Sequence, residues 1–202
     1  VLSLTEAAES EYKNYIESHD IRWSVVESLP VSEAIKYAGK DRDSLIDNYI
    51  KSLENLGKAG VTTVCYNFMP VLDWARTDLY FQWKDGSSSL YFDKVKFAYF
   101  EIYILERADA EKDYNAEILV KVETLKESIT EEDKKDLIDS IIVKTQGFVN
   151  GNISEDDLNP VALFKDLLKL YDGIDKDQLR ENMKYFLEKI MPVCDEYNIQ
   201  MC

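Results

Sequence analysis

The sequence predicts an α/β fold in which helices cover a parallel β-sheet. Residues 61–64, Val-Thr-Thr-Val, form a β-branched run directly after Gly60 and a long amphipathic segment, which is typical of a buried parallel strand that follows a helix. A second observation is the order of the elements, because helix, strand, helix and strand alternate along the first third of the chain with short connections.

The N-terminal elements follow from capping and periodicity. Residues 3–6, Ser-Leu-Thr-Glu, match a capping box, and apolar residues then recur at helical spacing to about residue 18. After a turn at 19–20, residues 21–26 are predicted to form the first strand. One face of that strand would carry Ile21, Trp23 and Val25.

The clearest helix is predicted over residues 41–58. Asp41 or Asp43 can cap its start, and Gly57 and Gly60 bracket its end. Its apolar residues recur at helical spacing and form one stripe, which is expected to face the sheet. The stripe consists of Leu45, Ile46, Tyr49, Ile50, Leu53 and Leu56.

The middle of the chain, about 78–160, is expected to form a hairpin and a helical insertion. Residues 78–93 hold two aromatic-rich runs around a Lys-Asp-Gly turn, which is typical of a β-hairpin. An aromatic helix over 94–107 is expected to pack on the hairpin. The highly charged stretch 108–139 is interpreted as a solvent-exposed helical insertion. A helix is expected to start at 130–133, Thr-Glu-Glu-Asp.

The last part of the chain is expected to return to the sheet. Residues 141–152 combine a short β-like run with a loop rich in Gly and Asn. Helices are predicted over 160–171 and 176–196, and Pro192 is expected to kink the second one. Residues 199–202 are predicted to form a final strand.

Composition restricts the classes of partner and compartment. The formal net charge of -15 argues against a nucleic-acid partner, which needs a basic face. No apolar run approaches the ~20 residues of a membrane helix, and the acidic start does not fit a signal peptide. Cys65, Cys194 and Cys202 are widely spaced without a CxxC motif, so reduced thiols and a cytoplasmic location are expected.

A cluster of polar side chains follows the strand predicted at 61–64. It consists of Asn67, Asp73, Trp74 and Arg76. Functional residues of α/β proteins are commonly found in the loops that follow the carboxyl ends of parallel strands. This combination is suited to binding a small anion with several hydroxyls, because it offers an amide, a carboxylate, an indole and a guanidinium. The alternative is structural: Arg76 pairs with Asp73, and Trp74 fills a gap.

The same stretch closely resembles the mannonate dehydratase family. The resemblance begins with Cys-Tyr-Asn-Phe-Met-Pro-Val-Leu-Asp-Trp at 65–74 and Arg-Thr-Asp-Leu at 76–79. Further similar segments, which point to the longer form of the enzyme with an insertion after the hairpin, lie at 41–43, 84–90, 104–107, 143–152 and 186–193. The resemblance implies a (β/α)8 TIM barrel, only partly represented here, as a single domain over 1–202.

The resemblance also implies a reaction. Members of the family are hydro-lyases that remove water from D-mannonate to give 2-keto-3-deoxy-D-gluconate in hexuronate (glucuronate) catabolism, with Mn²⁺ or Fe²⁺. Arg76 is then the candidate clamp for the substrate carboxylate or a neighbouring contact, because its fork matches two oxygens. Asn67 and Asp73 would bond sugar hydroxyls, and Trp74 would wall the pocket. No catalytic acid or base is assigned.

The chain departs from the family pattern in two places. The family's metal ligands, two histidines, a cysteine and an aspartate, lie beyond the strand at 199–202, whereas the one histidine here is His19. No metal ligand is therefore expected on this chain, which we interpret as an incomplete copy and expect to be inactive alone. Ser32 stands where the family has a histidine, in Ser-Glu-Ala-Ile-Lys at 32–36.

Two other functions stay open beside the lyase. One is a related metal-dependent sugar isomerase or epimerase barrel, which would share the architecture but not the string at 67–77. The other is a non-catalytic fragment that binds a sugar acid or a partner surface. Homo-oligomers are expected for barrels of this type, and the aromatic hairpin at 80–92 is a candidate contact, unless its aromatics simply cover the flank of the barrel.

Overall fold

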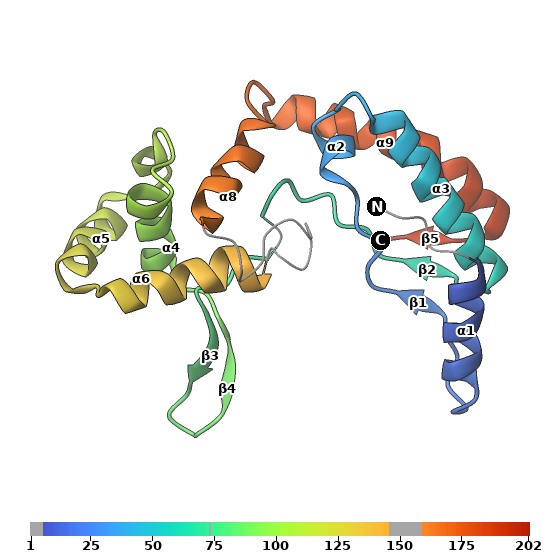
Figure 1. The fold of residues 1–202 in the computed structure, drawn as a ribbon, viewed down its shortest axis with the longest axis horizontal. Helices are drawn as coiled ribbons and strands as arrows, with labels where there is room; N and C mark the ends of the chain where they lie inside the picture. Colours follow the sequence, from blue (N-terminus) through green and yellow to red (C-terminus); the bar gives the residue numbers. More distant parts are fainter. Residues whose placement is uncertain (1–5, 73, 146–158) are drawn as a thin grey trace. The chain divides into compact units, whose positions relative to one another are not determined.

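The computed structural model describes residues 6–72, 74–145 and 159–202 (Figure 1). The chain divides into two compact units, one formed by residues 1–70 with 171–202 and the other by residues 71–170. The hairpin and helical insertion expected at about 78–160 fall within the second unit. A single domain over 1–202 stays a prediction.

The first unit contains a three-stranded parallel sheet in the order β1-β2-β5. Its strands are β1 (Val25–Val26), β2 (Thr63–Val64) and β5 (Gln200–Met201), with Val26 opposite Val64 and Val64 opposite Met201. The parallel sheet is confirmed, but each strand is shorter than predicted. The ladder begins only at Ser24, whose carbonyl accepts from the N–H groups of Thr62 and Thr63.

The described part of this unit contains four helices (Figure 1). They are α1 (Glu6–Glu17), α2 (Glu33–Lys36), α3 (Arg42–Lys58) and α9 (Lys176–Tyr197). Of these, α3 and α9 pack on the sheet. The capping box predicted for α1 lies at 3–6, and all of it except Glu6 is outside the described residues. Pro192 lies inside α9, as expected.

The apolar stripe predicted for α3 forms the centre of the core. Ile46, Tyr49, Leu53 and Leu56 are at most 5% exposed, and they pack with Val61 and Val64 of the β2 region and with Phe186 and Ile190 of α9. Asp41 occupies the N-cap position of α3, but its side chain makes no capping hydrogen bond. Leu179, Met183 and Leu187 of α9 are only half-buried, whereas Asn182 is buried.

The close approach of α3 and α9 depends on Gly57. A Cβ atom at this position would lie 2.5 Å from the Cβ of Tyr197, which rotation of the tyrosine side chain does not move. We expect Gly57→Ala to destabilise the protein by about 1–2 kcal/mol, because overpacking outweighs the roughly 1 kcal/mol that alanine gains in helix propensity. Urea unfolding measures this.

The matched control is Asn48→Ala, at an exposed position of the same helix. It is expected to be neutral or slightly stabilising, because only the helix propensity changes there. If Gly57→Ala is stabilising to the same degree, α3 and α9 do not approach as closely as the structure indicates.

The second unit consists of a hairpin and short helices. The hairpin is confirmed: β3 (Asp78–Gln82) pairs with β4 (Ser88–Tyr91) in antiparallel fashion. The helical segments are α4 (Lys94–Tyr99), the π-helix η1 (Phe100–Ile104), the 3₁₀ helix η2 (Ala110–Asp113), α5 (Ala116–Ser128), α6 (Glu131–Ile138), the π-helix η3 (Asp139–Val143) and α8 (Pro160–Lys169).

The predicted start of α6 is confirmed in atomic detail. The Thr130 hydroxyl accepts from the backbone N–H of Asp133 (3.1 Å), and the Asp133 carboxylate accepts from the backbone N–H of Thr130 (2.9 Å). These two bonds satisfy donors that the first helical turn leaves without partners. The capping residues therefore correctly indicate the helix α6 within the charged stretch.

The start of 141–152, whose secondary structure the sequence leaves open, is helical. Residues 141–143 belong to η3, which continues α6 without a break, and Ile141 and Ile142 are fully buried there. A short β-branched run does not distinguish a buried strand from a buried helical turn. The remainder of that prediction, from 146 onward, lies outside the described residues.

Candidate functional site

The carboxyl edge of the parallel sheet holds the first group of candidate residues. Beyond β1 and β2 the two loops are joined, because the Leu29 N–H donates to the Cys65 carbonyl (3.0 Å) and the Asn67 side-chain amide donates to the Ser28 hydroxyl (3.2 Å). Asn67 is half-buried. The loop that carries Asn67 is thus held in place by hydrogen bonds to the loop that follows β1.

A buried ammonium group, that of Lys36, donates a hydrogen bond to the backbone of the same loop. Lys36 is 1% exposed, and its Nζ donates to Glu33 Oε1 (2.7 Å) and to the carbonyl of Met69 (2.9 Å). A buried ammonium is stable only when its charge is paired and its protons are bonded. Lys36 therefore fixes the backbone of Met69, two residues beyond Asn67, to α2.

Two further side chains complete this network. The Tyr171 hydroxyl donates to the second oxygen of Glu33, and burial together with this carboxylate raises the pKa of Tyr171. Asn182 of α9 donates to the carbonyl of Lys36 (2.9 Å) and accepts from Gln178 (3.0 Å). Because its polar atoms are bonded at each step, the network specifies one arrangement of α2 and the loop.

Trp74 and Arg76 belong to the second unit. The Arg76 guanidinium lies over the Trp74 indole, with its Cζ 4.9 Å from the ring, and donates to the carbonyl of Ala75 (2.8 Å). Trp74 is 47% exposed. Stacking on the indole holds the plane of the guanidinium. The structure brings these two residues together, whereas Asn67 belongs to the first unit.

Asp73 lies outside the described residues. Its predicted bond to a sugar hydroxyl and the alternative pairing with Arg76 both stay predictions. Among the residues that the structure does describe, Arg76 takes part in no ion pair.

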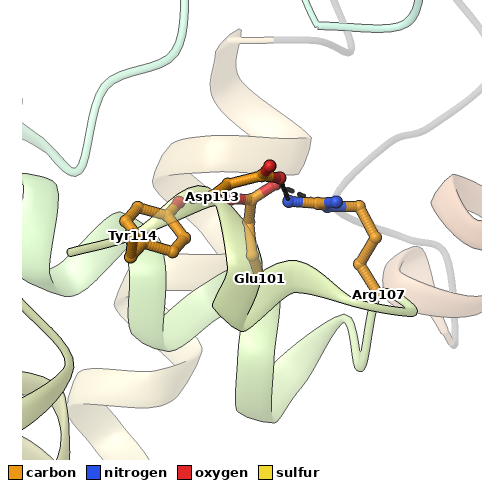
Figure 2. Close-up of polar contacts among 4 residues, drawn as sticks. All are labelled: Glu101, Arg107, Asp113 and Tyr114. Atoms are coloured by element: carbon orange, nitrogen blue, oxygen red, sulfur yellow. Dashed lines mark hydrogen bonds and ion pairs between the residues drawn. The ribbon is translucent and has the colours of Figure 1, made fainter. Parts of the chain in front are cut away.

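Arg107 provides a contrast within the second unit. Its Nε donates to Glu101 (2.9 Å), its Nη2 donates to Asp113 (2.6 Å), and the Tyr114 hydroxyl donates to Glu101 (Figure 2). These two carboxylates raise the pKa of the Arg107 guanidinium against the opposing effect of burial. An arginine with two carboxylate partners is a structural tie between η1 and η2, and it is a poor clamp for an anion.

His19 and Ser32 are the two positions at which the chain departs from the family pattern. His19 lies in the turn after α1, where its Nδ1 is 2.8 Å from the carbonyl oxygen of Tyr15. Ser32 is the N-cap residue of α2 without a side-chain capping bond. Across the three described ranges, no three His, Cys, Asp or Glu side chains gather as a metal site requires. The described donor set thus does not fit a divalent cation.

Sequence reasoning did not assign Glu33, Lys36, Tyr171 or Asn182 to the site. In the segment 32–36 the sequence singles out only Ser32, which stands where the family has a histidine. Tyr171 and Asn182 lie 138 and 146 residues from their partners Glu33 and Lys36. No local spacing announces contacts of that range, so only the fold reveals them.

Comparison with known proteins gives the family. The family model described as D-mannonate dehydratase (UxuA) matches residues 5–202. The chain belongs to the D-mannonate dehydratase family. The resemblance that begins at the loop after β2 is thereby confirmed, and it extends over nearly the whole sequence.

Two curated relatives have the same name. A mannonate dehydratase of Marinomonas sp. (strain MWYL1) is 45% identical over 189 residues, which is 94% of this chain and 46% of that protein. One of Chromohalobacter salexigens is 39% identical over 196 residues, 97% of this chain and 48% of that protein. The chain therefore spans about half the length of the curated mannonate dehydratases that it matches.

A solved structure agrees with the fold. The crystal structure of mannonate dehydratase from Streptococcus suis serotype 2 superposes with a TM-score of 0.64 at 26% identity, over 100% of this chain and 42% of that one. The α/β class is confirmed, and the chain represents only part of that TIM-barrel-type structure. Within the described ranges, no helix is both long and apolar enough to cross a membrane.

Proposed function

We propose that the complete protein is a mannonate dehydratase, a hydro-lyase that converts D-mannonate to 2-keto-3-deoxy-D-gluconate and water in hexuronate (glucuronate) catabolism. The observation that carries the proposal is the family match over residues 5–202, which includes the loop with Asn67, Trp74 and Arg76. The names of the two curated relatives support it as well.

The reaction assigns a task to each described side chain. Elimination removes a weakly acidic proton from C2, beside the carboxylate, and expels the C3 hydroxyl, so the substrate must be held in one register while protons move. Arg76 would bind the carboxylate through two parallel N–H donors, with Trp74 behind its guanidinium. Asn67 would bond a sugar hydroxyl.

The residues around Lys36 have a positioning role in this proposal. Lys36 bonds the Met69 carbonyl, and Ser28 accepts from Asn67, so the loop after β2 does not need to be ordered when substrate binds. Order that exists before binding lowers the entropy lost on binding.

We propose Mn²⁺ or Fe²⁺ as the cofactor, with ligands that this chain does not carry. The described residues do not gather a suitable donor set, so we derive no step through the metal. We also expect chain 1–202 to be inactive by itself, because the resemblance places the family's metal ligands beyond the strand at 199–202.

A keto-acid assay tests the proposal. The complete protein with Mn²⁺ is expected to form 2-keto-3-deoxy-D-gluconate from D-mannonate, and chain 1–202 is expected to form none. A complete protein that isomerises D-fructuronate but yields no keto acid would instead be an isomerase. If the complete protein transforms neither compound, the non-catalytic alternative holds.

Arg76→Ala in the complete protein is expected to lower kcat/KM for D-mannonate by about 10–100-fold, because a charge-assisted bond of roughly 1.5–3 kcal/mol is lost. Arg76→Lys is expected to recover only part of this, since an ammonium does not bond two oxygens in parallel. The control is Arg180→Ala, at an exposed residue that pairs only locally with Asp177. Equal effects of Arg76→Ala and Arg180→Ala would contradict the assignment.

We further propose a cytoplasmic homo-oligomer. The free thiols Cys65, Cys194 and Cys202 are consistent with a reducing compartment. The hairpin β3-β4 exposes Tyr80, Trp83 and Phe92, and exposed aromatic patches are typical of protein contacts.

A further inference from the structure

The strands β2 and β5 are each followed by a cysteine, and the two cysteines face each other. Cys65 follows Val64 and Cys202 follows Met201, and Val64 and Met201 are partners in the parallel register. Their Sγ atoms lie 3.2 Å apart. The two thiols are separated by 137 positions in the sequence, so only the pairing of β2 with β5 brings them together.

The backbone at both cysteines is fixed by the sheet. The Cys65 N–H donates to Val26 (2.9 Å), the Cys202 N–H donates to Val64 (3.1 Å), and the Cys202 carbonyl accepts from Tyr66 (3.0 Å). Neighbouring strands lie about 4.8 Å apart, within the roughly 4.4–6.8 Å that disulfides span between Cα atoms. A bond between these sulfurs therefore requires rotation of side chains and no movement of the strands.

The three cysteines differ in their burial. Cys202 is exposed and Cys65 is half-buried, whereas Cys194 is buried. The contact with the Cys202 thiol raises the pKa of Cys65, as does partial burial, so Cys65 is held as a thiol.

We propose that Cys65 and Cys202 form a redox-responsive dithiol, which a small-molecule disulfide such as glutathione disulfide converts to an intrachain disulfide. The Cys202 thiolate attacks one sulfur of glutathione disulfide and releases one glutathione thiolate. The Cys65 sulfur, after loss of its proton to solvent, then attacks Cys202 Sγ and releases the second glutathione. The protein loses two hydrogens, and glutathione disulfide is reduced to two thiols.

This modification acts at the carboxyl edge of the sheet and does not rest on the proposed function. The disulfide would join β2 covalently to β5 just before the loop that carries Asn67. Free thiols and the disulfide are exchanged through a mixed disulfide, so the state of the pair follows the redox poise of its surroundings.

The test uses the complete protein, equilibrated with glutathione and glutathione disulfide, alkylated at low pH and digested for peptide mass analysis. A peptide cross-linked between Cys65 and Cys202 is expected, and Cys194→Ser is expected to leave its yield unchanged. In Cys65→Ser, a mixed disulfide of glutathione is expected at Cys202, because the second displacement has no thiol. Absence of the cross-linked peptide, or of glutathione on Cys202 in that variant, would overturn the proposal.

A second measurement separates a built pair from two accessible thiols. The equilibrium constant for the disulfide is expected to be at least about 100-fold higher in the folded protein than in urea, because the fold replaces the millimolar effective concentration of a flexible tether with a fixed contact. Equal constants in both conditions would show that the sheet does not prepare the pair.

Discussion

Lys36→Ala is expected to lower the free energy of unfolding by about 3–5 kcal/mol, which is typical of removing one partner from a buried ion pair. The Lys36 side chain is 1% exposed and that of Glu33 is 15% exposed, so water does not readily replace the lost ammonium. The Met69 carbonyl loses a bond at the same time. Urea unfolding followed by tryptophan fluorescence and by circular dichroism gives the change.

Lys51→Ala is the matched control. Lys51 and Glu54 also form an ion pair three residues apart, at 2.8 Å against 2.7 Å for Lys36 and Glu33, but the Lys51 side chain is 55% exposed. Solvent screens such a pair, so unfolding is expected to change very little. Similar losses in Lys36→Ala and Lys51→Ala would mean that Lys36 is not buried. Lys36→Met with Glu33→Gln is expected to restore much of the stability, because no unpaired charge then stays buried.

Phe186→Ala is expected to destabilise the first unit by about 3–5 kcal/mol, the usual range for removing a buried aromatic side chain. Phe186 is fully buried, and its ring centroid lies 5.0 Å from that of Tyr49 and 5.9 Å from that of Phe68. These three rings join α9, α3 and the loop after β2. Thermal unfolding is expected to show a correspondingly lower Tm.

Two variants bracket this effect. Phe186→Leu keeps most of the buried volume and is expected to cost about 1.5 kcal/mol or less. Met191→Ala removes a side chain on the same helix that is 38% exposed, so a loss under about 1 kcal/mol is expected. The assignment of Phe186 to the centre of the core fails if Met191→Ala is as destabilising as Phe186→Ala.

The helices were largely predictable from the sequence because their signals are local. The stripe from Leu45 to Leu56 repeats at helical spacing, and α3 ends at the predicted residue. Strand positions were predictable as well, but their lengths were not, since pairing depends on where the neighbouring strand begins. The secondary structure of 141–143 stayed open for a related reason: burial of these residues in η3 comes from tertiary packing, which composition does not reveal.

The candidate site was predictable only where a contiguous string carries it. Asn67, Trp74 and Arg76 stand within one loop sequence, whereas the network of Lys36, Tyr171 and Asn182 exists only through folding. The cysteines show the same limit. Their wide spacing predicts only reduced thiols, whereas the parallel register of β2 and β5 brings Cys65 and Cys202 into contact.

The π-helical turns affect how this chain should be aligned with longer and shorter relatives. A residue inserted into an α-helix rotates the following side chains by about 100° around the axis, whereas a π turn takes up one extra residue within a single turn. η1 directly continues α4, and η3 directly continues α6. A single-residue gap in an alignment therefore belongs inside 100–104 or 139–143. A gap placed in a flanking α-helical turn would misalign every apolar residue between that gap and the π turn.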